Sequence, residues 1–230
     1  MKRAFYGRAV ILFAIVIQFL SASAQISESV TAFKFGMFNV TSARKSVNGQ
    51  AVLYIKIFKG NEFIMADSAI TDAALCQGFS FPVKQPFTDY FVFSKHAKKS
   101  GRTYIFTKTG SFAAIGGGTF WAAPKDKLLF ILAEKDYRNL VVFSIKEMKT
   151  VFEKYSCDEF TDWYYRHGNY FGKVSTECGD ELKTEKEVNE WMHPVEIEQF
   201  NVKLHTLDEM HITDEQVEKA KPLVKYAGCK

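Results

Sequence analysis

The residues that could perform nucleophilic catalysis are concentrated around position 160. Cys157, Asp158, Asp162 and His167 supply a thiol, two carboxylates and an imidazole, the groups that such catalysis uses. No local motif of a known nucleophile surrounds Cys157, and Cys178 is near enough in sequence to bind it in a disulfide. We therefore predict no catalytic residue.

A metal site would have to combine His193, His205 and His211 with Asp208 or Glu209. Zinc-binding histidines commonly occur as closely spaced pairs, such as H-x₃₋₅-H or HExxH. The separations here are 12 and 6 residues, which match neither pattern. We predict no metal site and no cofactor.

An aromatic segment next to the acidic residues is the strongest candidate for a binding surface. Aromatic side chains with polar tips recur where proteins grip sugars or other proteins. The alternative is a cluster that packs against a sheet. The predicted binding residues are Trp163, Tyr164, Tyr165, Arg166, His167, Tyr170 and Phe171.

Four cysteines point to disulfide bonds. An even number of cysteines in an exported chain favours pairing, and no C-x-x-C motif indicates zinc or redox chemistry. We predict the pairs Cys157–Cys178 and Cys76–Cys229. The alternative is that some of them are buried free thiols.

The first 24 residues have the three-part layout of a secretory signal peptide. Lys2, Arg3 and Arg8 precede an apolar run over residues 9–20, and Ala22-Ser23-Ala24 provides a cleavage site. The layout resembles the leaders of proteins exported by Gram-negative bacteria. A membrane span needs roughly 20 apolar residues, so we expect cleavage after Ala24 rather than a retained anchor. The mature chain is expected to be periplasmic or extracellular, without a transmembrane segment.

Charge is distributed unevenly along the mature chain. The formal net charge of +4 falls to +1 without the leader, which holds three positive charges. Residues 25–150 contain 17 Lys and Arg against 9 Asp and Glu, whereas residues 151–230 contain 10 against 17. We expect the two parts to attract each other, and we expect no nucleic-acid partner because the net charge is small.

Short alternating runs predict an antiparallel sheet protein. Residues 29–41 alternate as one strand, and Val52–Phe58 places Ile55 and Ile57 on one face. Asn48-Gly49 and Lys59-Gly60-Asn61 are hairpin turns. From Phe87 onward, turns recur about every ten residues, as in an antiparallel meander.

Three consecutive glycines, Gly116 to Gly118, raise the question of a phosphate-binding loop. Such a loop needs a helix directly after the glycines. Thr119-Phe120-Trp121 and then Pro124 follow instead. We predict a bend where another backbone approaches closely.

The stretch "GGGTFWAAPKDKLLFILAEKDYRNLVVFSI" resembles the repeating hairpin of a β-propeller blade. A closed propeller needs at least four blades, and the sequence offers about three such units. We therefore predict a mainly β fold, as an antiparallel meander, a sandwich or a partial propeller-like sheet, with a C-terminal α+β portion.

The C-terminal portion differs in composition. We predict helices over residues 184–192 and from Thr213, where Gln216 completes a capping box, and a strand over residues 195–207. The expected organisation is a signal peptide (1–24), a β-rich region (25–154) and an acidic α+β portion (155–230) packed on it as one domain.

These observations favour a binding protein over an enzyme. We expect an exported interaction protein of the bacterial cell envelope, whose partner is another envelope protein or a carbohydrate. The alternative is a secreted hydrolase whose site lies among C-terminal carboxylates such as Asp158, Glu159 and Asp162 and the histidines.

Overall fold

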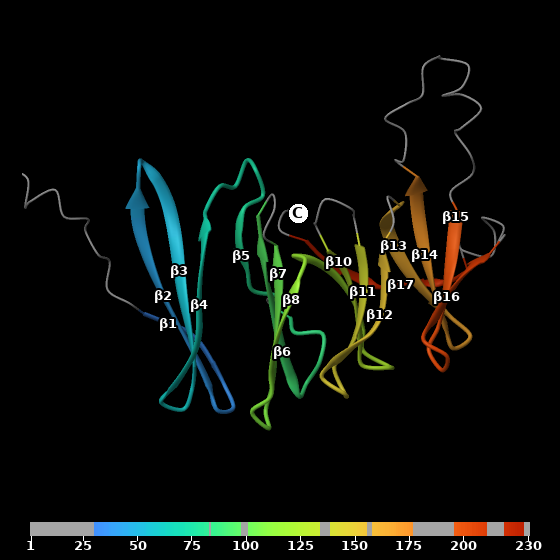
Figure 1. The fold of residues 1–230 in the computed structure, drawn as a ribbon, viewed down its shortest axis with the longest axis horizontal. Helices are drawn as coiled ribbons and strands as arrows, with labels where there is room; N and C mark the ends of the chain where they lie inside the picture. Colours follow the sequence, from blue (N-terminus) through green and yellow to red (C-terminus); the bar gives the residue numbers. More distant parts are fainter. Residues whose placement is uncertain are drawn as a thin grey trace, which may run out of the picture.

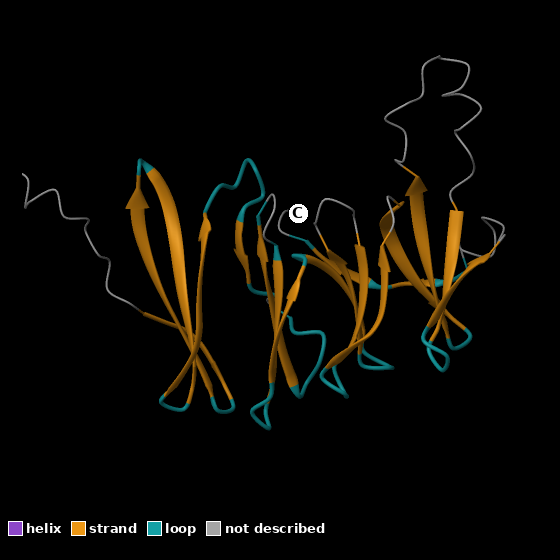
Figure 2. Cartoon of the chain, in the orientation of Figure 1, coloured by secondary structure: helices purple, strands orange, loops and turns teal. Residues whose placement is uncertain are grey.

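The computed structural model describes residues 30–82, 84–97, 101–133, 139–155, 158–176, 196–210 and 219–227. In these ranges the chain forms strands and no helix (Figure 2). The described residues therefore contain no helix long and apolar enough to cross a membrane. The prediction of a mainly antiparallel β protein is confirmed. The helix predicted over 184–192 lies outside the described residues. Of the helix predicted from Thr213, only the part from residue 219 onward is described, and it is not helical: residues 219–220 form a turn, and β17 (Lys221–Pro222) follows as a strand because its backbone pairs with β13 (Asp158–Arg166).

The strands form four antiparallel sheets in sequence order. The first sheet contains β1 (Val30–Phe35), β2 (Phe38–Val47), β3 (Gln50–Lys59) and β4 (Glu62–Ile70). The second contains β5 (Gly78–Ser80), β6 (Tyr90–His96), β7 (Arg102–Thr107) and β8 (Phe112–Gly116). The third contains β9 (Thr119–Ala123), β10 (Leu128–Ala133), β11 (Asn139–Ser144) and β12 (Lys149–Tyr155). The fourth contains β13 (Asp158–Arg166), β14 (Asn169–Thr176), β15 (Glu196–Asn201) and β16 (Thr206–Met210).

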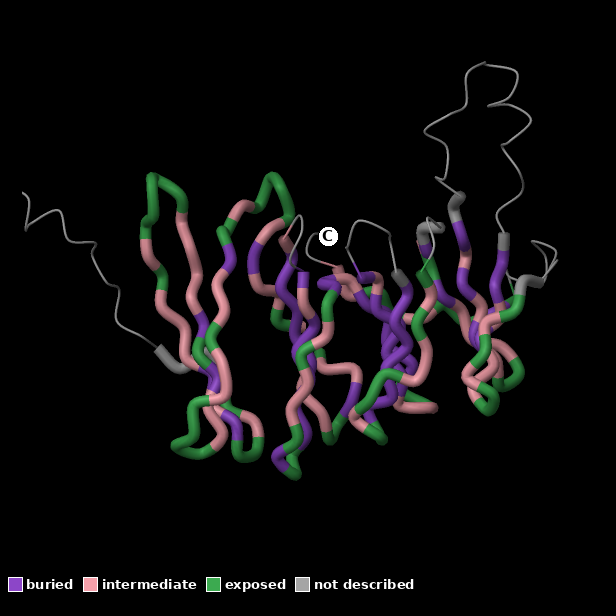
Figure 3. Tube along the Cα trace, viewed as in Figure 1, coloured by how far each residue is buried: buried purple, intermediate pink, exposed green. Residues whose placement is uncertain are grey.

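The sheets stand side by side as an open array, from the first at one end to the fourth at the other (Figure 1). A separate apolar core fills each of the three seams between neighbouring sheets. The second and third sheets are therefore covered on both faces, whereas within the described part of the chain each end sheet packs on one neighbouring sheet. Figure 3 shows that the buried residues are concentrated in the middle of the array.

Strand alternation explains how one sheet supplies two cores. In β9, Phe120 and Ala122 belong to the core shared with the second sheet, whereas Trp121 and Ala123 belong to the core shared with the fourth. Successive side chains of a strand point to opposite faces, so a sheet buried on both faces needs continuous apolar runs. The sequence "TFWAA" is such a run.

Two short C-terminal strands tie the last two sheets together. β17 (Lys221–Pro222) pairs with β13 in the fourth sheet, and β18 (Val224–Tyr226) pairs with β9 in the third. The ring of Tyr226 stacks on Phe120 at 4.7 Å, and Lys225 Nζ donates a hydrogen bond to the carbonyl oxygen of Thr161. The segment after Ala220 thus bridges two sheets along one edge.

Most predicted turns are present, but two segments predicted as single strands are hairpins. Asn48 (φ 51°) and Gly49 (φ 79°) close β2 onto β3, as expected. Residues 29–41 instead turn at Gly36 (φ 56°) to form β1 and β2. The predicted strand 195–207 is instead broken after Asn201, whose side chain accepts hydrogen bonds from the amides of Lys203 and Leu204 and so stabilises a turn. Hydrophobic alternation continues through both turns, so the sequence pattern alone does not reveal them.

Candidate functional site

The predicted binding segment forms the hairpin β13–β14. His167 (φ 49°) and Gly168 (φ 90°) are the two turn residues, and both are exposed. Positive φ at both central positions is the geometry that matches the twist of antiparallel strands. The hairpin therefore divides the aromatic residues between the two faces of the fourth sheet.

Three of the seven predicted residues face inward. Trp163 and Tyr170 are buried in the core of the third seam, and the half-buried Tyr165 packs against it. The Trp163 ring stacks on Phe130 at 4.1 Å, and Tyr170 donates a 2.6 Å hydrogen bond to the Asp126 carboxylate. Trp163 and Tyr170 are therefore core residues that no ligand on the surface can touch.

The other face of the hairpin presents a different set of side chains. Tyr164 lies opposite Phe171, and Gln199 and Asp208 continue the same row on β15 and β16. Tyr164 and Phe171 are both half-buried. Burial raises the pKa of the Tyr164 hydroxyl, and the negative charge of Asp162 raises it further. We call this outer surface of the fourth sheet the Tyr164 face.

Polar groups flank the aromatic pair of the Tyr164 face. Arg166 pairs with Asn169 on one side, and Asp162 pairs with Lys173 on the other. Ile197, which occupies an outward register position opposite Lys173, is buried, so the open part of the face is its Tyr164 side. Rings next to hydrogen-bonding groups can bind a sugar or a protein surface.

The candidate nucleophilic group is not assembled by the described residues. Cys157 lies outside them, and the side chains of Asp158 and Glu159 are not described. Asp158 begins β13 and His167 follows its end, so about 30 Å of extended strand separates them. Asp162 is exposed on the Tyr164 face.

Of the candidate metal ligands, only some can be placed. His205 lies in the turn after β15, Asp208 belongs to the Tyr164 face, and Glu209 pairs with Glu198. His193 and His211 lie outside the described residues. Within the described part of the chain, no three His, Cys, Asp or Glu side chains come together as a metal site would require.

The glycine-rich segment is a close backbone contact, as predicted. A Cβ atom on Gly117 (φ 108°) would lie 2.3 Å from the carbonyl oxygen of Leu132, and one on Gly118 would lie 2.4 Å from that of Lys95. β9 follows the glycines directly. The glycines therefore let the chain between β8 and β9 pass close to the backbones of β10 and β6. A phosphate-binding loop would need a helix after the glycines, and a strand follows them instead.

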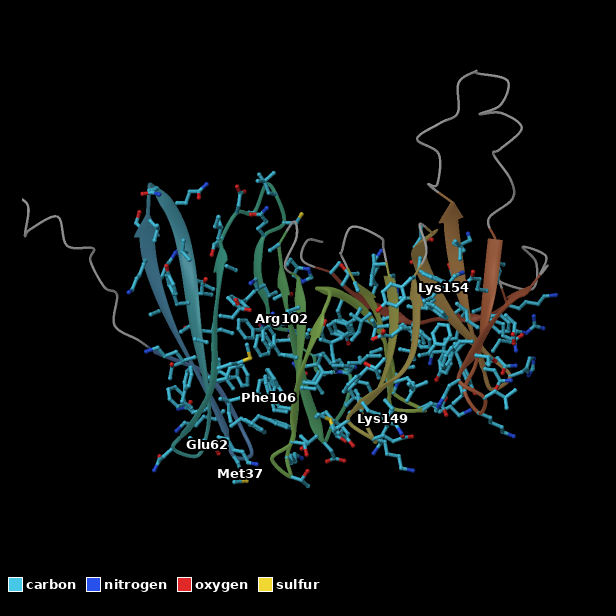
Figure 4. All side chains as sticks on the ribbon, viewed as in Figure 1. Met37, Glu62, Arg102, Phe106, Lys149 and Lys154 are labelled. Carbon is cyan, nitrogen blue, oxygen red and sulfur yellow. The ribbon has the colours of Figure 1, made fainter. Side chains whose placement is uncertain are left out.

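A buried polar cluster in the first seam is absent from the sequence prediction. Lys95 and His96 are the last residues of β6 and are both buried; Lys95 lies on the strand face of Phe93, toward the first sheet, and His96 lies on the opposite face. Lys95 pairs with Asp67 at 2.8 Å, and Tyr104 donates a hydrogen bond to the same carboxylate. Arg102 reaches it more loosely, at 3.6 Å. Figure 4 shows Arg102 and Phe106 between the first and second sheets.

A second surface that the sequence analysis missed is the outer face of the first sheet, which we call the basic face. Its lysines are Lys34, Lys45 and Lys56, and no Asp or Glu occupies an outward register position on the described strands β1 to β4. The ammonium group of Lys45 lies 5.4 Å from the centre of the Tyr54 ring. The apolar residues of this face are Ala43, Val47, Val52, Tyr54, Phe58, Phe63, Ala66 and Ile70.

Cysteine pairing is described at one position. Cys76 is disulfide-bonded and lies two residues before β5. Cys157, Cys178 and Cys229 lie outside the described residues. The predicted pairs Cys76–Cys229 and Cys157–Cys178 stay predictions, as does the signal peptide of residues 1–24.

Comparison with known proteins identifies a structural likeness only. No protein-family model matches the chain, and no curated protein sequence matches it. The fold is similar to the β-propeller domain of the Trilobed protease from Pyrococcus furiosus, described as having an open velcro topology, with a TM-score of 0.41 and 11% identity. The match covers 83% of this chain and 57% of that chain.

Proposed function

We propose that this chain is an exported, non-enzymatic binding protein of the bacterial cell envelope, which holds a protein or carbohydrate partner on its Tyr164 face. The observation that carries the proposal is the cross-strand row of Tyr164, Phe171, Gln199 and Asp208. The row combines two rings with hydrogen-bonding groups on the face of an end sheet that no other described sheet covers.

The core behind the Tyr164 face supports a binding role because it holds the face rigid. Trp163 and Tyr170 alternate with the outward residues and are fixed by stacking on Phe130 and by the hydrogen bond to Asp126. Side chains held by packing lose little conformational entropy when a partner binds. The buried rings thus stabilise the hairpin, whereas the outward rings are the ones that would contact a partner.

The experiment is a thermal-shift screen of residues 25–230 against a panel of glycans, followed by calorimetric titration of any ligand that shifts the melting temperature. A ligand that binds only the folded state stabilises it by about 2.7 kcal/mol at 100 times its Kd. Tyr164→Ala should abolish the shift. Tyr155→Ala, at an exposed site on β12, is the matched control and should keep it.

Export is tested separately by fractionating cells that produce the full chain. The leader predicts a product that begins at Gln25 and leaves the cytoplasm. A full-length product in the cytoplasm would contradict this part of the proposal.

A further inference from the structure

We propose that the basic face, on the outer side of the first sheet, binds the surface of an anionic lipid bilayer. The inference goes beyond the proposed function, because it concerns a different sheet from the Tyr164 face and a different kind of partner. The first sheet is one end of the array, and its described core lies on the inward side, in the first seam (Figure 1). Its outward side chains therefore face away from every other described sheet.

The lysines of the basic face are spread over three strands. Lys34 lies on β1, Lys45 on β2 and Lys56 on β3, and Lys34 and Lys56 are exposed. The ammonium group of Lys45 lies over the Tyr54 ring. An anionic bilayer presents negative charge over its whole surface, so it can attract all three lysines without matching the position of any one of them.

The carboxylates of the first sheet lie on its inward side and leave this charge uncompensated. Asp67 is in the first seam, where it pairs with Lys95 at 2.8 Å. Glu62 lies opposite Lys59, whose register position is also inward. Just beyond β4, Asp72 accepts hydrogen bonds from the backbone amides two and three residues further along the chain. The outward register positions of the described strands β1 to β4 therefore carry positive charge only.

Exposed apolar side chains are concentrated in the same part of the molecule. Most of the large apolar side chains that are exposed in the described part of the chain belong to residues 37–81, namely Met37, Val47, Phe63, Ile70, Leu75 and Phe81. Val47, Phe63 and Ile70 are on the basic face itself, and Phe63 is 56% exposed. An exposed surface that combines apolar and charged residues in this way marks an interaction with a protein or a membrane.

The arrangement of these residues favours a bilayer over a protein partner. Phe58 pairs with Phe63 beside the turn at Gly60, and Val52 pairs with Ile70 at the opposite end of the strands. The rows between them are Thr41, Lys56 and Ala66, and Ala43, Tyr54 and Ser68. A protein interface has an apolar centre and a polar rim. This face has the reverse order, with a largely polar or small-residue centre and apolar ends.

The exposed apolar residues also favour a bilayer over a carbohydrate. Val47, Phe63 and Ile70 have no hydrogen-bonding group in their side chains, whereas a sugar is bound by rings combined with polar groups, as on the Tyr164 face. On a membrane-binding surface, apolar side chains enter the boundary between headgroups and acyl chains. Lysines beside them keep their ammonium groups at the headgroups while their apolar stems pack below.

Co-sedimentation of residues 25–230 with vesicles tests the proposal, the leader being omitted because its apolar run would itself bind lipid. We expect binding to vesicles of equal parts phosphatidylglycerol and phosphatidylcholine, little binding to phosphatidylcholine alone, and release at high ionic strength because salt screens the attraction. Lys45→Glu/Lys56→Glu should lower the partition coefficient at least about thirtyfold, since each lysine near an anionic surface contributes about fivefold. Lys84→Glu/Lys146→Glu, with the same charge change at exposed sites outside the face, should keep most of the binding.

Tryptophan fluorescence tests whether the basic face is the surface that touches the lipid. The emission of Phe63→Trp, measured as the difference from the parent, should shift to shorter wavelength when anionic vesicles are added. Leu204→Trp, at an exposed apolar position in the turn after β15, should show no such shift. A shift for Leu204→Trp but not for Phe63→Trp would assign lipid binding to another surface and overturn the proposal.

The outcomes separate this inference from the proposed function. A parent chain that binds neither kind of vesicle, or binds both equally, overturns the inference. Binding to soluble poly-glutamate without binding to anionic vesicles also overturns it, because the face would then belong to an acidic polymer. Glycan binding by the Tyr164 face is measured without lipid, so none of these results decides the proposed function.

Discussion

The ammonium group of Lys95 lies 2.8 Å from a carboxylate oxygen of Asp67, and this ion pair joins β6 of the second sheet to β4 of the first. Both side chains are largely shielded from solvent, and Tyr104 donates to the same carboxylate. Burial alone would raise the pKa of Asp67, but hydrogen bonds from Lys95, Tyr104 and the Ser68 amide together lower it. The ionised carboxylate is therefore part of what fixes the first seam.

Asp67→Asn should destabilise the protein by about 2–3 kcal/mol near neutral pH, because it leaves Lys95 buried without its counter-charge. The pKa of Asp67 is lower in the folded state than the unfolded value of 3.8. Its contribution is thus complete above that value and is lost as the pH falls through the folded pKa, so the gap between parent and variant should narrow in acid.

Urea denaturation at several pH values measures this effect. Asp89→Asn is the control, since Asp89 forms an exposed ion pair with Lys108 that should contribute well under 1 kcal/mol. Equal losses for the two variants would contradict the role of the Asp67 cluster.

His96 should make the fold sensitive to mild acid. Burial lowers the pKa of His96 from 6.5, and its Nε2 is hydrogen-bonded to Ser94 at 2.8 Å. As the pH falls, His96 is therefore protonated at a higher pH in the unfolded chain than in the folded chain. Its contribution to stability is present above pH 6.5 and declines as the pH falls below that value.

Replacement His96→Gln should flatten the pH dependence of the melting temperature just below pH 6.5. His167→Asn, in the exposed turn of β13–β14, should retain the parent's slope, because Asn tolerates its positive φ. A parent whose melting temperature is constant over this pH range would refute the prediction.

Adding a methyl group at the triple glycine should test the close backbone approach. Gly117→Ala should cost at least about 2 kcal/mol, because the new Cβ would overlap the Leu132 carbonyl and the φ of 108° is unfavourable for alanine. Gly116→Ala has open space and should be nearly neutral. Similar melting temperatures for the two variants would show that the strands are not in contact there.

Neighbouring residues in β13 should respond differently to truncation. Trp163→Ala should cost about 3–5 kcal/mol because it opens a cavity in the core of the third seam. Tyr164→Ala should cost much less, since Tyr164 is only half-buried on the opposite face. Chemical denaturation of the two variants and the parent measures the predicted difference in their free energies of unfolding.

Cysteine pairing is tested by peptide mapping under non-reducing conditions. We expect the peptide that contains Cys76 to be linked to the C-terminal peptide with Cys229, because β17 and β18 lead from the fourth sheet to the third, in the direction of the second. A peptide that links Cys76 to Cys157 or Cys178 would contradict both predicted pairs.

The sequence by itself determined the β character, the main turns and the role of the glycines. Alternation along Val52–Phe58 put Ile55 and Ile57 on one face, and both are buried. Asn48-Gly49 is a turn because both residues accept positive φ. These features depend on local backbone preferences, which can be read from neighbouring residues alone.

Only the tertiary structure decided which of these residues are buried and which lie on the surface. Alternation shows that Trp163 and Tyr164 point to opposite faces, but not which face another sheet covers, and the third sheet covers the Trp163 side. Likewise, Lys95 reads as a solvated charge until β4 brings Asp67 beside it, 28 residues away in sequence. Burial and pairing depend on contacts between distant segments, so the sequence pattern could not reveal them.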